Sequence, residues 1–174
     1  MSRTSERAKG APQRYLIALG SNQRHHRYGA PAAVLRAALA ALETACISIE
    51  ATSRIVASAP LGPSRRRYAN AAAVISSGLT PDDLLAALKA VERNFGRKPR
   101  AARWSARVLD LDIVLWSGGA WSSPSLELPH AAFRARAFVL IPARTVAPEW
   151  RDPHTALTIR QLAARLTRPR PLPR

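Results

Sequence analysis

Residues 107–115 have the sequence Arg-Val-Leu-Asp-Leu-Asp-Ile-Val-Leu, an apolar run that carries two carboxylates two positions apart. Successive side chains of a β-strand point to opposite faces, so Asp110 and Asp112 share one face while Leu111 and Ile113 point into a core. Two carboxylates about 6–7 Å apart on one strand repel each other unless a cation lies between them. Taken alone, the pair fits a Mg²⁺ site, a solvated acidic face, or salt bridges to arginine.

The apolar patterns on both sides of this strand predict an α+β fold. We expect β-strands at residues 15–19, 47–58, 68–76, 108–116 and 137–141, and helices from Pro31, from Pro81 and at residues 158–166. The helix from Pro81 has the clearest limits, because Thr80 can cap it and Gly96 can end it. The order β-α-β-β-α-β predicts a ferredoxin-like antiparallel sheet with helices packed on it, in a three-layer αβα arrangement with C-terminal additions.

The length of 174 residues and the apolar fraction of 47% fit one folded domain, which we expect at residues 14–167. Residues 1–13 are polar and predict a disordered leader without a secretory signal, and residues 168–174 predict an extended basic tail. No apolar run approaches the roughly 18–20 residues of a membrane span. Cys46 is the single cysteine, which excludes an internal disulfide and a cysteine-based zinc site. We therefore expect a cytoplasmic protein.

The charge of the chain indicates an anionic partner. Lys and Arg number 27 against 11 acidic residues, 24 of the 27 are arginine, and the formal net charge is +16. The arginine fork suits phosphate, but composition leaves nucleic acid, a nucleotide and an acidic membrane open. Six cations lie just upstream of the two aspartates, namely Arg93, Arg97, Lys98, Arg100, Arg103 and Arg107. Carboxylates and guanidinium groups together are typical of a Mg²⁺-polyphosphate site, although some of these arginines also fit a solvated surface.

Aromatic side chains recur beside polar ones. Tyr68 and Asn70 are two positions apart on a predicted strand, so a ring and an amide project from the same side and suit a flat heterocycle. Tyr68 also fits an ordinary half-buried strand position, and Trp104, between cations, fits either a ligand cover or a core anchor. A further group of cations and aromatics comprises His130, Arg134, Arg136 and Phe138. The histidines at 25–26 have no evident partner and are assigned to a loop.

Together these segments resemble the 6-hydroxymethyl-7,8-dihydropterin pyrophosphokinase family of folate biosynthesis. The matching stretches are residues 18–22 (ALGSN), 60–63 (PLGP), 68–72 (YANAA), 92–97 (ERNFGR), 103–104 (RW), 107–113 (RVLDLDI) and 129–130 (PH). They cover about residues 15–150 in order. The RxLDLDI segment, with GR and RW upstream, is far more specific than an isolated pair of aspartates.

The resemblance implies transfer of pyrophosphate from ATP to the hydroxymethyl oxygen of the pterin, with release of AMP. Asp110 and Asp112 would hold two Mg²⁺ ions, while Arg97 and Arg107 would neutralise charge on the transferred group, which makes these four the implied catalytic residues. Trp104 would lie on a mobile loop whose closure excludes water.

The resemblance also implies two sets of binding residues. The implied ATP contacts are Arg97, Trp104, Arg107, the backbone near Ile113, His130 and Arg136. The implied pterin contacts are Tyr68 and Phe138 on its two faces, Asn70 at its edge, and the backbone near Leu61.

A ferredoxin-like RNA-binding module without catalysis is the alternative. Such a module needs solvent-facing aromatic residues on its central strands, where this chain offers mainly Tyr68, and two carboxylates would repel an RNA backbone. We therefore expect ATP and the hydroxymethyldihydropterin as partners, no nucleic acid and no membrane, and a monomeric enzyme.

Overall fold

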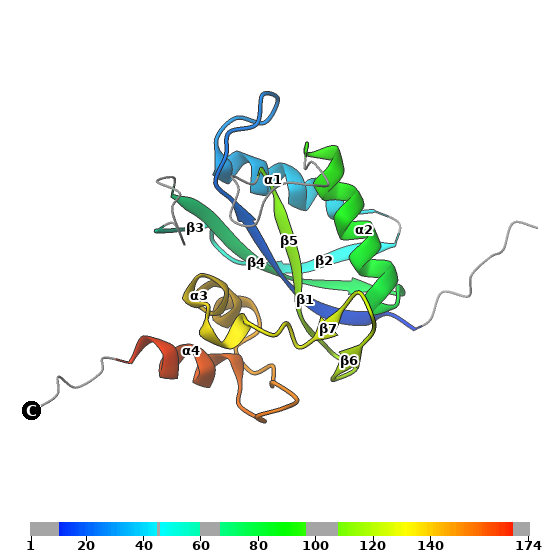
Figure 1. The fold of residues 1–174 in the computed structure, drawn as a ribbon, viewed down its shortest axis with the longest axis vertical. Helices are drawn as coiled ribbons and strands as arrows, with labels where there is room; N and C mark the ends of the chain where they lie inside the picture. Colours follow the sequence, from blue (N-terminus) through cyan, green and yellow to red (C-terminus); the bar gives the residue numbers. More distant parts are fainter. Residues whose placement is uncertain (1–10, 45, 60–66, 97–107, 169–174) are drawn as a thin grey trace, which may run out of the picture.

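The computed structural model describes residues 11–44, 46–59, 67–96 and 108–168. Figure 1 shows a twisted sheet with α1 and α2 on one side and α3 and α4 on the other. Along the chain the elements are β1 (Gln13–Ser21), α1 (Pro31–Leu42), β2 (Ile47–Thr52), β3 (Val56–Ser58), β4 (Tyr68–Ser77), α2 (Pro81–Asn94), β5 (Asp110–Trp116), β6 (Trp121–Ser122), β7 (Glu127–Leu128), the 3₁₀ helix η1 (Phe133–Ala135), α3 (Ala137–Val146) and α4 (Ile159–Thr167). β1 begins one residue before the domain boundary expected from the sequence.

The main sheet has the strand order β2-β4-β1-β5, with β3 paired to the remaining length of β4. Each neighbouring pair is antiparallel. The connections through α1 and α2 each cross a neighbouring strand, so β1 and β4 occupy the centre and β2 and β5 the outside. This is the split βαβ arrangement of ferredoxin-like folds, and the predicted fold class is confirmed.

Two apolar cores cover the two faces of the sheet. Ile17 packs with Leu35 of α1 and Leu88 of α2 in one core. Its neighbour Leu16 packs with Leu140 of α3 and other residues of the second core. Adjacent residues of β1 therefore serve opposite faces, as the period of two requires. The three layers are thus a consequence of strands that are apolar on both sides.

The helix signals in the sequence are confirmed at α2 and α4. The Thr80 hydroxyl accepts the Asp83 N–H at 3.3 Å, and Pro81 occupies the first helical turn. At α4, the Thr158 hydroxyl accepts the Gln161 N–H at 3.1 Å while the Gln161 side chain accepts the Thr158 N–H at 2.9 Å. This reciprocal capping satisfies two donors that the helix leaves unpaired.

Two sequence expectations need correction. Residues 137–141 are not a strand, because they form the first half of α3. A short apolar run does not distinguish a buried strand from a buried helix, and here Val139, Leu140 and Ala143 pack into the second core at helical spacing. The single strand expected at residues 47–58 is divided into β2 and β3, and the register of β2 on β4 shifts between Ile49 and Ala51.

Candidate functional site

The register of β4, β1 and β5 brings residues from distant parts of the sequence onto one face of the sheet. Asn70 lies opposite Gly20, and Gly20 lies opposite Asp110. One step along the sheet, Ala18 lies opposite Asp112. Directly opposed residues of antiparallel strands point to the same face, so the amide and both carboxylates share it. With neighbouring strands about 4.8 Å apart, the backbones of Asn70 and Asp110 are separated by two strand spacings, roughly 10 Å.

The central strand of this face carries only small residues between the amide and the carboxylates. Gly20 has no side chain, and a Cβ built on it would lie 3.6 Å from the Asn70 Oδ1 atom. Ala18 contributes only a methyl group next to Asp112. No bulky side chain of β1 therefore stands between β4 and β5 on this face.

The β4 side of the face holds its polar group in a fixed orientation. Asn70 is 3% exposed, and its Nδ2 donates to the Ser58 hydroxyl of β3 at 2.9 Å. Tyr68 lies opposite Ser58 and is half-buried, two positions from Asn70 on the same face. A ring and an amide edge thus stand together, as the sequence predicts.

The β5 side carries the two half-buried carboxylates. Among the described residues, no group of three or more His, Cys, Asp or Glu side chains is arranged to hold a metal ion. Asp110 and Asp112 would thus need oxygen ligands from a substrate and from water to complete a coordination sphere. This donor set fits Mg²⁺, which binds one or two carboxylates together with substrate phosphates.

His130 lies beside the outer edge of β5. Its backbone N–H donates to the Val114 carbonyl at 3.0 Å, and its ring atom Nδ1 accepts the backbone N–H of Ala132 at 3.2 Å. In the neutral imidazole the proton is then on Nε2, which remains a donor for an anion. Ile113 is 2% exposed, so its contribution to binding would come from its backbone.

Arg136 and Phe138 lie at the start of α3, the helix that packs on β4 and contacts β3. The Arg136 guanidinium lies 5.8 Å from the centre of the Phe138 ring, and both side chains are half-buried. Ala72 points to the same face of the sheet as Asn70 and packs in the core that α3 covers. The start of α3 therefore adds a cation and an aromatic ring on this face.

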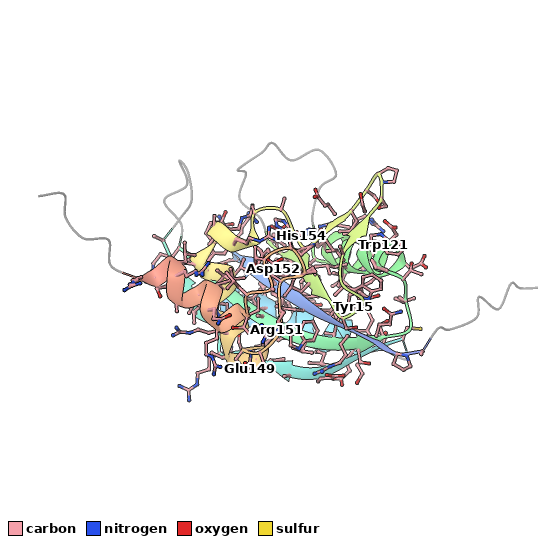
Figure 2. The ribbon with its side chains drawn as sticks, turned by 90° about the horizontal axis from the view of Figure 1, so that it is seen from below. Tyr15, Trp121, Glu149, Arg151, Asp152 and His154 are labelled. Carbon is pink, nitrogen blue, oxygen red and sulfur yellow. The ribbon has the colours of Figure 1, made fainter. Side chains whose placement is uncertain are left out.

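Arg134, which the sequence grouped with these residues, has a structural role instead. Its Nε and Nη2 donate to Asp152 at 2.7 and 2.6 Å, and Asp152 is fully buried. Burial by itself raises the pKa of Asp152, but hydrogen bonds from Arg134, from the Thr155 hydroxyl and from the His154 N–H outweigh it and lower the pKa to about 2. Figure 2 shows Asp152 and His154 on the segment between α3 and α4.

Four predicted site residues, Leu61, Arg97, Trp104 and Arg107, lie outside the described residues. The histidines at 25–26, for which the sequence indicated no partner, lie in the loop between β1 and α1, and the structure gives them contacts. The Nδ1 of His25 accepts the N–H groups of Arg27 and Tyr28, and the ring centres of His25 and His26 lie 4.3 Å apart.

Sequence reasoning gave no role to the side chains of Lys89 and Glu92. Glu92 is fully buried and accepts the N–H of Leu111, the residue between the two aspartates, at 2.7 Å. The available signal was an acidic residue in the last turn of a helix, where the helix dipole disfavours it.

Comparison with known proteins identifies the family to which this arrangement belongs. The family described as 7,8-dihydro-6-hydroxymethylpterin-pyrophosphokinase (HPPK) matches residues 16–148. The chain belongs to this family. Membership supports the enzyme predicted from the sequence and gives no support to the RNA-binding alternative.

The HPPK relatives extend over most of the chain. The 2-amino-4-hydroxy-6-hydroxymethyldihydropteridine pyrophosphokinase of Pseudomonas aeruginosa is 41% identical over 143 residues, which are 81% of this chain and 85% of that protein. The protein of the same name from Synechocystis is 36% identical over 129 residues, 74% of this chain and 66% of that protein.

A solved structure shares the fold at low sequence identity. The HPPK-DHPS protein of Plasmodium falciparum superposes with a TM-score of 0.73 at 14% identity, covering 92% of this chain and 46% of that one. This chain therefore spans less than half of that protein's length. No helix among the described residues has the length and apolar character that crossing a membrane requires.

Proposed function

We propose that the chain transfers pyrophosphate from ATP to 6-hydroxymethyl-7,8-dihydropterin, a step of folate biosynthesis, on the sheet face that carries Asn70, Asp110 and Asp112. The observation that carries the proposal is the Asn70–Gly20–Asp110 register. On one face of the sheet, this register places an amide that suits a flat heterocycle near two carboxylates that suit Mg²⁺. Between them, β1 carries no bulky side chain.

The pterin would lie over β4. Tyr68 would stack on one face of the ring and Phe138 of α3 on the other, as flat heterocycles favour. Asn70 would read the ring edge, since an amide offers a donor and an acceptor side by side. Because the Asn70 Nδ2 donates to Ser58 of β3, the Oδ1 acceptor is the atom that points away from β3. The backbone near Leu61 would complete the edge contacts.

The nucleotide would lie along β5. The N–H and C=O of Ile113 would meet the adenine, and the His130 Nε2–H and the Arg136 guanidinium would donate to phosphate oxygens. Arg97 and Arg107 would neutralise charge on the transferred group, and Trp104 would cover the site. Arginine suits these roles because its planar fork binds two phosphate oxygens at once.

Asp110 and Asp112 would hold Mg²⁺, with two ions in the proposed complex. When bound, the metal would draw charge from the phosphate oxygens and favour attack at the β-phosphorus. The chain's own residues orient the two substrates. The pterin hydroxyl oxygen forms a bond to the β-phosphorus and its proton is released to solvent, while the bond from that phosphorus to the α-phosphate oxygen breaks and AMP leaves. Positioning and electrostatics suffice for this kind of transfer.

The proposed enzyme is a cytoplasmic monomer with its catalytic domain at residues 14–167, and it needs neither nucleic acid nor a membrane. Incubation with ATP, Mg²⁺ and 6-hydroxymethyl-7,8-dihydropterin tests the activity directly. AMP should form only when all three are present, while ATP and Mg²⁺ without pterin control for hydrolysis. A folded protein that binds neither substrate would refute the proposal.

A further inference from the structure

The outer edge of β5 is bound by two side chains of α2. The Glu92 Oε1 atom accepts the Leu111 N–H at 2.7 Å. The Lys89 Nζ donates to the Leu111 carbonyl at 3.3 Å and to the same Glu92 oxygen at 2.9 Å. One ion pair therefore engages both backbone polar groups of the residue between Asp110 and Asp112.

Strand geometry converts this contact into a constraint on the carboxylates. In an antiparallel sheet, the N–H and C=O of one residue point to the same side, and those of the next residue point to the other. Because the Leu111 groups face α2, the backbone groups of Asp110 and Asp112 face β1, where these residues lie opposite Gly20 and Ala18. The segment is held from both edges, which fixes where its two carboxylates emerge.

The side chain of Leu111 adds a third restraint. It is fully buried in the core that α2 shares with the sheet. Because it points away from the face that carries the carboxylates, the backbone cannot rotate without removing it from that core. The position of the aspartates thus depends on α2 although they point away from it.

Glu92 is an unfavourable choice on grounds of stability alone. It is fully buried, and it lies in the last turn of α2, where the helix dipole disfavours negative charge. A buried ion pair is often no more stabilising than well-packed apolar residues of the same volume. A carboxylate at this position does, however, accept an edge N–H that no apolar side chain can accept.

We propose that Glu92 is a positioning residue for the Mg²⁺ ligands Asp110 and Asp112, with Lys89 as its partner. Glu92 acts through the Leu111 peptide rather than on the substrate. This inference rests on the proposed function, because it concerns the geometry that the two carboxylates offer to Mg²⁺ and phosphate.

The test compares Glu92→Ala, which removes the acceptor, with Glu92→Gln, which keeps an oxygen for the Leu111 N–H. Lys89→Met removes the partner cation. Glu149→Gln is the control, because Glu149 forms an exposed ion pair with Arg160 in another part of the fold. The first readout is the Mg²⁺ concentration that half-saturates binding of α,β-methylene-ATP, and the second is pterin affinity without nucleotide.

In Glu92→Ala the half-saturating Mg²⁺ concentration should rise by about tenfold or more, the usual effect of losing a group that orients a metal ligand. Glu92→Gln should recover most of this loss, pterin affinity should stay within about twofold, and Glu149→Gln should match the wild type. Amide exchange at Leu111 should accelerate in Glu92→Ala but not in Glu92→Gln.

An unchanged Mg²⁺ midpoint in Glu92→Ala would overturn the inference, and so would an equal loss of pterin affinity, which indicates general loosening of the fold. If Glu92→Ala does not fold, Lys89→Met decides in its place, and an unchanged midpoint there has the same meaning. A wild-type chain that binds Mg²⁺ and nucleotide but forms no AMP would refute the proposed transfer and leave the Glu92 comparison intact.

Discussion

Replacement of Asp112 by alanine should abolish turnover and leave the fold at least as stable as before. Asp112 is half-buried on β5, opposite Ala18, and shares a face with Asp110. Alanine retains the strand backbone and removes one of two like charges. The same change that removes the proposed metal ligand therefore relieves a repulsion in the folded state.

The size of the stability effect follows from the strand geometry. Two residues apart on a strand, the carboxylates are about 6–7 Å apart, and their repulsion is about 0.6 kcal/mol in water and about 2.5 kcal/mol at an effective dielectric constant of 20. Half-burial places the value between these limits, near 1 kcal/mol. In a domain of this size that corresponds to a rise in Tm of about 2–4 °C.

The assay measures AMP formation over a range of Mg²⁺ concentrations, with thermal unfolding of the same samples by circular dichroism. We expect kcat to fall by about 10²–10³-fold or more, the scale found when a preorganised electrostatic group is removed from a reaction centre. Glu127→Ala is the matched control, because it removes an exposed carboxylate of β7. Mg²⁺-dependent AMP formation at the wild-type rate in Asp112→Ala would refute the metal assignment. A Tm several degrees below the wild type would refute the electrostatic reasoning.

Three further predictions follow from contacts in the structure. Asp152→Asn should destabilise the fold by about 3 kcal/mol, because it leaves the Arg134 charge without its partner. With a folded-state pKa of about 2, Asp152 contributes stability above about pH 4 that is lost on acidification toward pH 2. The variant should therefore lack this pH dependence in urea unfolding. Burial, His26 and Arg27 lower the pKa of His25 in the folded state, so the contribution of His25 to folding stability is complete above about pH 6.5 and declines below it. If the urea midpoints of the wild type and of His25→Gln change equally between pH 7.5 and 5.5, this prediction is contradicted. Asn70→Ala should raise the KM for the pterin about 10–100-fold with little change in the KM for ATP, since it removes the amide that is proposed to contact the pterin edge; an equal rise in both constants would indicate a general defect.

Local signals in the sequence were sufficient for much of the fold. The alternation around Asp110 and Asp112 predicted a strand with two carboxylates on one face, and β5 has that pattern. Thr80 and Pro81 predicted the start of α2, and the structure contains that cap. These features succeed because a cap or a side-chain period of two depends only on neighbours within a few residues.

The apolar run at residues 137–141 is where local reasoning failed. As a strand or as a helix it would bury similar residues, and the run is too short for its period to decide. The second face of the sheet decides between them, because Leu16, Ala72 and Val74 need an apolar cover and α3 supplies it. That requirement becomes visible only once β1 and β4 are paired.

The sequence by itself therefore determined the kinds of groups available for chemistry: paired carboxylates, an aromatic ring beside an amide, a basic chain, and motifs that resemble the HPPK family. Only the tertiary structure decided which of them meet. The strand register sets Asn70 and Asp110 on either side of Gly20. Arg134 is bound to Asp152 and so is not available to the candidate site. Glu92 reaches the peptide between the aspartates for the same reason. Each of these contacts joins segments far apart along the chain, and it is set by strand pairing and core packing rather than by any local pattern.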